Sequence, residues 1–236
     1  MMPPDSSAIP TLLPRSSDFR RHQRALPLGT DTLAGATRLS SLEPLLLKDL
    51  QRFDARARAG EGLEVVEVLA AAVRHNRPLR LMVEHGEHIL PLTVRPRERL
   101  VQAPLPAAAW DALNWPGLRV LQVEPAGPAP GDNSAAMPAI PLGPVLWALA
   151  LRGARAELLP EIVGPAAYRI APTTDLAALE LGNVLGVAVA RLQRETAALD
   201  DIARWPGMNR ERASRLLNGL YLQAGLIVSR AHPAAS

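Results

Sequence analysis

The sequence predicts an α+β protein with two folded parts, and three observations support this prediction. Residues 41–124 combine helix-like spacing with alternating strand-like segments. Six prolines lie between Pro125 and Pro144, a density that is incompatible with a helix or a central strand. Residues 183–230 show successive short amphipathic patterns that end in an apolar run. We therefore expect a small α+β domain, a Pro-rich linker and a helical C-terminal module.

The N-terminal domain is expected to begin with two helices. Ser41 and Pro44 suit a helix start, and an apolar stripe follows at helical spacing, made of Leu46, Leu47, Leu50 and Phe53. A second helix is predicted from Leu63 to about His75. A hairpin of strands near 79–83 and 89–94 follows, then a strand at 100–103, a helix at 107–113 and a strand at 118–123. These elements fill residues 41–124.

The remaining segments connect or precede the folded parts. Residues 1–40 lack sustained periodicity, so we expect a mobile tail. Residues 125–144 form the predicted linker. Residues 145–182 are predicted to hold a short apolar helix that contains Trp147, followed by a bridge to the C-terminal module at 183–236. The pattern leaves open whether this connecting stretch packs against the first domain, the second or both.

The C-terminal module is predicted to contain three helices. One amphipathic stripe, from Asn183 to Arg194, consists of Val184, Leu185, Ala188 and Leu192. A second, short helix begins at Leu199. Pro206-Gly207 ends that helix, and Asn209 is a favourable N-cap for the third. The third helix carries the stripe Ala213, Leu216, Leu217 and Leu220. Gly225 is expected to take the left-handed conformation that ends the helix, before a strand at 226–228.

This order resembles the winged helix-turn-helix family over about residues 183–230. The resemblance includes the step Gly225-Leu226-Ile227 ahead of the wing. It implies that residues 210–224 form the recognition helix. A complete wing also needs a second strand, but only six residues follow Arg230. Either the wing is truncated, or its partner strand comes from elsewhere in the chain.

The predicted recognition helix exposes a mixed surface. Once the buried stripe is removed, Glu211, Arg212, Arg215, Asn218, Gly219 and Leu222 are expected to face outward. Arg side chains suit phosphates and Asn suits adenine, whereas Gly219 and Leu222 suit an apolar protein contact. Residues 183–236 hold seven Arg and four acidic residues, a modest excess for a DNA-binding module. The candidate protein or DNA contacts are Arg210, Arg212, Arg215, Asn218, Leu222 and Arg230.

Two further segments contain candidate site residues. Arg95, Arg97 and Arg99 alternate with Pro96 and Glu98, so a strand here would place three guanidinium groups on one face. Such a face suits an acidic partner or a phosphate-bearing ligand. An exposed edge strand explains the pattern equally well. The segment from Glu84 to His88 holds two His and two Glu, which suits a metal ion. Neighbouring strand positions point to opposite faces, so a solvated hairpin tip is the favoured interpretation, and we predict no metal site.

Composition narrows the function without naming it. The 236 residues include no Cys and 26 basic residues against 23 acidic ones, a net charge of +3. All the basic residues but Lys48 are Arg, which is typical of a GC-rich bacterial genome. The chain has no P-loop, dinucleotide-binding or GxSxG motif and no stretch typical of a signal peptide or membrane span.

These features favour a bacterial, cytoplasmic, non-enzymatic regulatory or adaptor protein. We expect it to bind no cofactor and no membrane, and to contact another protein through its helix-turn-helix-like module. The alternative is a DNA-binding transcriptional regulator that uses the helix 210–224. An enzyme that depends on a metal or phosphate is the least favoured class, and the sequence leaves the oligomeric state open.

Overall fold

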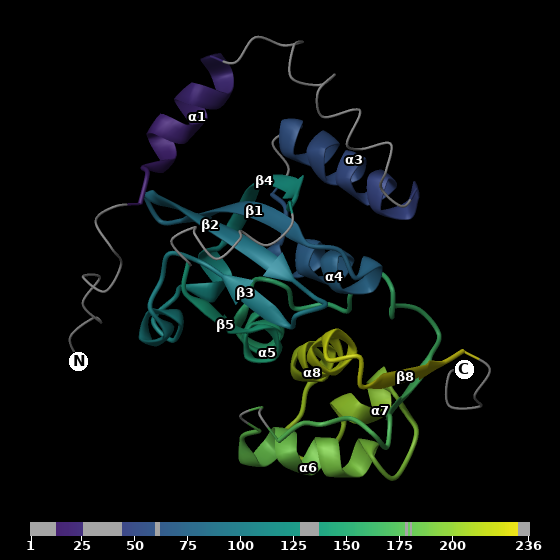
Figure 1. The fold of residues 1–236 in the computed structure, drawn as a ribbon. Coiled ribbons are helices and arrows are strands. Elements are labelled where there is room, and N and C mark those ends of the chain that lie inside the picture. Colours follow the sequence, from purple (N-terminus) through teal and green to yellow (C-terminus); the bar gives the residue numbers. More distant parts are fainter. Residues whose placement is uncertain are drawn as a thin grey trace. The chain divides into compact units, whose positions relative to one another are not determined.

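The structure, a computed structural model, describes residues 13–25, 44–59, 62–127, 137–177, 179 and 181–230. Its helices and antiparallel sheets confirm the predicted α+β class (Figure 1). The chain divides into two compact units, unit 1 (Met1–Leu142) and unit 2 (Gly143–Ser236). No helix in the described ranges is both long and apolar enough to cross a membrane.

Unit 1 is built around a five-stranded antiparallel sheet with the order β4-β1-β2-β3-β5. Its helices α3 and α4 contact each other, and both contact β4. The core includes Leu46 and Phe53 of α3 and Val66 and Leu69 of α4, as their spacing predicts. Its elements are α1 (Ser16–Ala25), α3 (Pro44–Arg58), α4 (Val65–His75), β1 (Leu79–His85), β2 (His88–Arg95), β3 (Leu100–Gln102), β4 (Arg119–Pro125) and β5 (Ala139–Pro141).

The predictions for the two segments that flank this domain, the tail at 1–40 and the linker at 125–144, are wrong in part. Residues 13–25 belong to the predicted tail, yet they hold α1. The chain just before α1 bonds to the hairpin, with Ile89 N donating to Pro14 O at 2.9 Å. Arg20 also donates two hydrogen bonds to the Glu84 carboxylate, at 2.7 and 2.8 Å. The rest of the tail, 1–12 and 26–40, lies outside the described residues.

The predicted linker, 125–144, also contributes to the fold. Its first residue ends β4, and β5 lies within it as an edge strand paired with β3. An edge strand needs hydrogen bonds on one side only, which is why a Pro-containing segment can occupy this place. Residues 128–136 lie outside the described part. The helix predicted at 107–113 is a single 3₁₀ turn, Ala107–Trp110.

Unit 2 combines four helices of the described residues with a small sheet. These are α5 (Leu142–Arg152), α6 (Asn183–Leu192), α7 (Leu199–Ala203) and α8 (Arg210–Leu222), with β6 (Ala167–Ile170), β7 (Ala197–Ala198) and β8 (Leu226–Ser229). The stripe Ala213, Leu216, Leu217 and Leu220 is fully buried, so the predicted phase of α8 is correct. Asn209 caps α8 by accepting from the backbone N of Arg212 at 2.7 Å.

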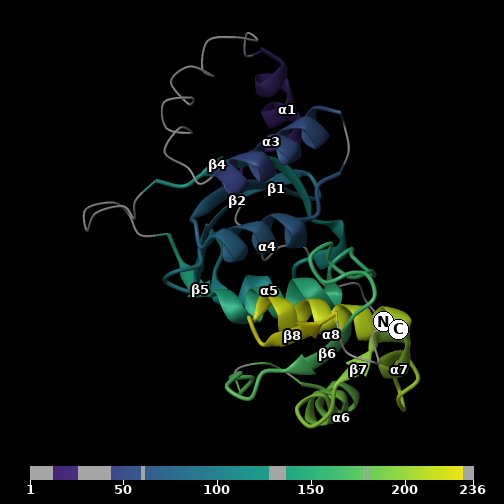
Figure 2. The ribbon, with the colours of Figure 1, turned by 90° about the vertical axis from the view of Figure 1, so that its right-hand side faces the viewer.

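The strand after α8 finds its partner upstream in the chain. β8 pairs antiparallel with β6, from Ala167 opposite Ser229 to Ile170 opposite Leu226, and β6 also pairs with β7 (Figure 2). The three-stranded order is therefore β7-β6-β8. The strand predicted after Gly225 therefore has a partner strand from elsewhere in the chain. α5 and β6 both belong to unit 2, so the connecting stretch lies with the C-terminal module.

The end of α8 differs from the prediction in which residue is left-handed. Ala224 has φ +56°, and Gly225 does not have a positive φ. The backbone N of Gly225 donates to Leu220 O and that of Ala224 to Tyr221 O, both at 2.9 Å. This is the Schellman pattern with Ala in the left-handed position. Gly225 is needed for another reason, because a Cβ there would lie 2.3 Å from Cγ2 of Thr174.

Candidate functional site

The second half of α8 is a buried structural face. Arg215, which we expected to be outward-facing, has a side chain only 16% exposed. Its Nη1 donates to the carbonyls of Gly153 at 2.8 Å and Leu151 at 3.3 Å, while its Nε donates to Glu211 Oε1 at 2.8 Å. Arg215 therefore satisfies carbonyls at the C-terminal end of α5, which a helix leaves without partners.

The side-chain amide of Asn218 forms hydrogen bonds to main-chain atoms through both its oxygen and its nitrogen. It is 1% exposed, its Oδ1 accepts from Leu159 N, and its Nδ2 donates to Glu157 O, both at 2.8 Å. A buried amide with both ends bonded fixes the path of the chain that follows α5. Because it is buried and directed at main-chain atoms, the amide is not accessible to recognise adenine.

The apolar end of this face is covered in the same way. A Cβ on Gly219 would lie 2.7 Å from ring atoms of Trp147 in α5, so the two helices meet closely at this point. Leu222 is 3% exposed. The prediction that Arg215, Asn218, Gly219 and Leu222 face outward is therefore wrong, because α5 and the chain after it cover that side of α8.

Arg230 also bonds within unit 2. Its Nη1 donates to Val163 O at 3.0 Å and its Nη2 to Glu161 O at 3.4 Å. These contacts hold the end of β8 against the chain that leads into β6. Arg230 is exposed, but its guanidinium is oriented by these carbonyls.

The N-terminal end of α8 remains open to solvent. Arg210 is exposed and forms an ion pair with Asp200. Arg212 is also exposed and donates from Nη1 to the carbonyl of Gly207. Among the described residues, no carboxylate lies within ion-pair distance of Arg212, which sets it apart from Arg210 and Arg215. Of the six predicted contact residues, these two present a charge to solvent at the start of the helix.

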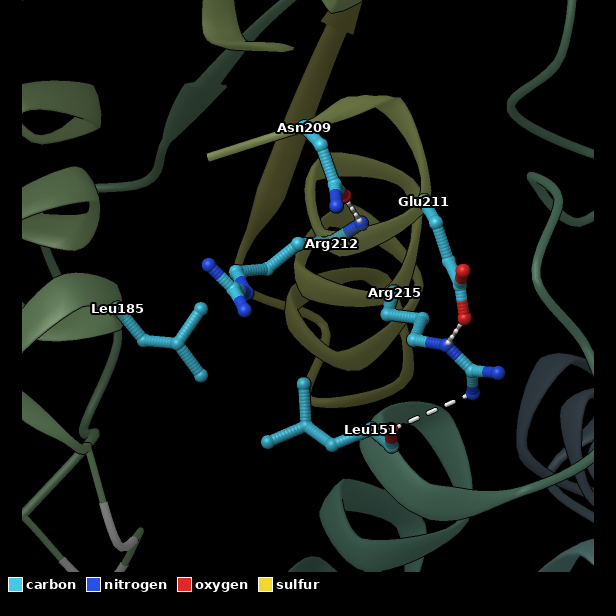
Figure 3. A pocket seen from close by; sticks show the side chains of 6 residues that line it. All are labelled: Leu151, Leu185, Asn209, Glu211, Arg212 and Arg215. Carbon is cyan, nitrogen blue, oxygen red and sulfur yellow. Dashed lines mark hydrogen bonds and ion pairs between the residues drawn. The ribbon is translucent and has the colours of Figure 1, made fainter. Parts of the chain in front are cut away.

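A surface pocket of about 360 Å³ lies beside this end of α8. It is lined by Leu151 of α5, Leu185 of α6 and a polar group on and before α8: Asn209, Glu211, Arg212 and Arg215. Figure 3 shows Leu185 and Arg212 pointing toward one another, with Leu151 directed toward the space between them. The pocket joins an apolar wall from two helices to a polar wall from a third.

Sequence reasoning missed the two leucines of this pocket. It assigned Val184 and Leu185 to a buried stripe of α6, but Val184 is exposed and Leu185 is half-buried. Ala188 and Leu192 of the same stripe are buried, so the helix phase is correct and only its first turn emerges from the core. The available signal was a run of apolar residues too wide for one face, from Val184 to Val189.

The arginines predicted on one strand face are not arranged that way. β2 ends at Arg95, and residues 96–99 form a turn closed by Arg99 N donating to Pro96 O at 3.1 Å. Arg95 is only 6% exposed, and its Nε donates to Gln102 Oε1 at 3.1 Å. Arg97 and Arg99 are exposed on the turn. The strand prediction fails here because Pro96 cannot donate to a ladder and favours a turn.

The Glu84–His88 segment is the tip of the hairpin between β1 and β2. Its loop has two residues, and one of them, Gly86, has φ +60°. Glu84 accepts from Arg20, and His85 Nε2 accepts from the backbone N of Asn114 at 3.3 Å. Burial, reinforced by the charge of His88, lowers the pKa of His85 below its usual 6.5. Across the described residues, no three His, Asp or Glu side chains converge as metal ligands would.

Comparison with known proteins adds no relative: no family model matches this chain, and no curated protein or solved structure matches it.

Proposed function

We propose that this protein is a non-enzymatic regulatory or adaptor protein that contacts another protein through unit 2. The observation that carries the proposal is the pocket at the start of α8. Two leucines from other helices there face Arg212, which has no carboxylate partner among the described residues. Protein interfaces combine apolar contact area with a few polar anchors in this way. The helix order of unit 2 and its small sheet are also compatible with a winged helix-turn-helix-like module, a type of unit used for recognition.

The charge pattern favours a protein partner over DNA. Arg204, Arg210 and Arg215 of this region pair with Asp201, Asp200 and Glu211, in that order. Such pairing weakens the positive field that DNA binding depends on. The buried half of α8 also makes it a poor candidate for lying along a major groove, because α5 occupies the side that would face the DNA.

The test is binding by the full chain. The tagged protein is purified with its bound partners from the cells that contain it, and the partner is then purified and titrated by calorimetry. We expect a stoichiometric complex that the double variant Arg210→Glu with Arg212→Glu or the variant Val187→Glu weakens. Val187 is a suitable site because it is 66% exposed on α6.

The matched control is Arg52→Glu, an exposed change on α3 of unit 1. It should leave the affinity unchanged. A complex that ignores the unit 2 variants but is lost with the unit 1 variant would contradict the proposal, as would the absence of any stoichiometric complex.

The alternative function, DNA binding, is favoured by one specific observation. The start of a recognition helix is the part that reaches base edges in helix-turn-helix proteins, and Arg210 and Arg212 are exposed there. A labelled duplex titrated at several salt concentrations distinguishes the two functions. If DNA is the partner, replacing both arginines with Ala lowers the slope of log K against log salt by about 2, at roughly 0.9 for each phosphate contact. We expect no saturable binding at physiological salt.

A further inference from the structure

Only some of the charged residues that line the pocket beside α8 form ion pairs with one another. Glu211 and Arg215 neutralise each other, and Arg215 also donates to carbonyls at the end of α5. Arg212 contributes a positive charge without such a carboxylate partner among the described residues. The net charge of the lining is therefore positive. A ligand that carries a carboxylate complements it, and a cationic ligand is repelled.

The opposite wall selects for an aliphatic group. Leu151 and Leu185 come from helices that are distant in sequence, and both are half-buried. Figure 3 shows their side chains on the side of the pocket that faces Arg212. Filling the space between them with an aliphatic side chain removes the apolar surface of three groups from water at once, which favours binding.

The size of the pocket decides between a small molecule and a peptide. A volume of about 360 Å³ is at the low end of the range for small-molecule sites, and the polar lining comes mostly from one helix. One or two side chains of a peptide fit this volume, with the peptide backbone remaining outside.

We propose that this pocket binds an acidic segment of the partner protein. One Asp or Glu carboxylate of that segment pairs with Arg212, and a nearby Leu, Ile or Val side chain lies between Leu151 and Leu185. The inference rests on the proposed function, since it names the chemistry of the protein that unit 2 contacts. It also assigns Leu151 and Leu185, which the sequence did not indicate, as contact residues.

The experiment selects peptides without assuming the partner. A phage library of random 12-residue peptides is panned against the full-length protein, and enriched peptides are synthesised with a fluorescent label for anisotropy titrations. We expect the enriched sequences to share an acidic residue within a few positions of an aliphatic one. Their affinity should fall as salt rises, because the charge of Arg212 is exposed.

Variants test the two walls separately. Arg212→Glu places like charges together and should weaken the best peptide about tenfold or more. Leu185→Asp should weaken it to a similar degree, and thermal melts check that each variant is folded. The matched control is Arg194→Glu, a change at an exposed arginine of unit 2 whose Nε donates to the Ala190 carbonyl. The affinity of this control variant for the peptide should stay within about twofold of that of the original protein.

A charge swap makes the result specific to the pocket. A peptide with Lys in place of its acidic residue should bind Arg212→Glu more tightly than it binds the original protein. Enriched peptides without acidic residues, no enrichment, or equal affinity for the original and Arg212→Glu would overturn the inference. If the stoichiometric partner complex also persists with Arg212→Glu, the proposed function stands and only the pocket assignment fails.

Discussion

Arg215 in α8 donates from Nη1 to the backbone carbonyl of Gly153 at 2.8 Å, one residue beyond the end of α5. This bond joins two helices that are about sixty residues apart in sequence. It also places a positive charge at a helix C-terminus, where the helix dipole is negative. An arginine that resembles a nucleic-acid contact in the sequence is thereby part of the internal structure of unit 2.

Replacing Arg215 with Ala should destabilise the protein. The carbonyls of Leu151 and Gly153 lose their donor in a partly buried place, so we expect a cost of about 1–3 kcal/mol in the free energy of unfolding. Urea denaturation followed by circular dichroism measures it. Arg212→Ala is the control, and it should change the free energy by less than about 0.5 kcal/mol. Equal effects of the two variants would refute the capping role.

Two glycines in helices should respond to Ala with opposite signs. A Cβ at Gly219 lies 2.7 Å from the Trp147 ring, so Gly219→Ala should cost about 1–3 kcal/mol through overpacking. A Cβ at Gly186 of α6 meets nothing within 4 Å, so Gly186→Ala should stabilise by about 0.5–1 kcal/mol. Thermal melts of both variants provide the comparison. A stabilising Gly219→Ala would mean that α5 and α8 are not in close contact.

The Asn218 amide offers a nearly isosteric test. Asn218→Asp keeps the acceptor for Leu159 N but turns the donor that faces Glu157 O into a second acceptor with a charge. We expect a loss of about 1–3 kcal/mol or more at neutral pH. Asn209→Asp is the paired control, because Asp is an equally good N-cap at the start of α8. Similar melting temperatures for the two variants would rule out the buried bridge.

Acid stability should depend on Asp49 of α3. Burial raises its pKa, but hydrogen bonds from His75 at 2.8 Å and Arg74 at 2.5 Å, with their charges, outweigh burial and hold the pKa below 3.8. A carboxyl with a lowered folded pKa stabilises the fold above the unfolded value, and the effect disappears as pH falls through the folded value. Asp49→Asn should therefore be less stable than the original protein at pH 6.

The difference should shrink as the pH falls below about 3.8, and it should disappear once the pH has passed through the lower folded pKa of Asp49, where the carboxyl of the original protein is neutral as well. Denaturation at a series of pH values measures this convergence. Parallel curves for the two proteins across that range would show that Asp49 does not act through its charge.

The elements of this fold were predictable where local spacing determines them. The stripe from Ala213 to Leu220 and the cap at Asn209 correctly set the phase and start of α8. The second buried face of α8 was not predictable, since nothing near Asn218 in sequence reveals that carbonyl and amide groups of residues 157–159 meet it. A polar residue buried by distant main-chain partners has no periodic signature.

Two errors had local causes of a different kind. Arg95 to Arg99 alternates like a strand, yet Arg99 adopts φ +56°, a conformation that sequence rules associate with Gly or Asn. β6 is only four residues long and was interpreted as part of a bridge. The pocket was not predictable from local patterns either. Its leucines come from separate helices, and only the tertiary fold brings them beside Arg212.

The pairing of β6 with β8 has a consequence during synthesis of the chain. Ile170 and Leu226, opposite each other in the ladder, are 56 residues apart. At about 5–20 residues per second, β6 emerges roughly 3–11 seconds before its main partner strand exists. During that interval its edge and Tyr168 lack the cover they have in the finished protein. Faster or slower translation between these two strands should therefore change the yield of correctly folded protein more than its final stability.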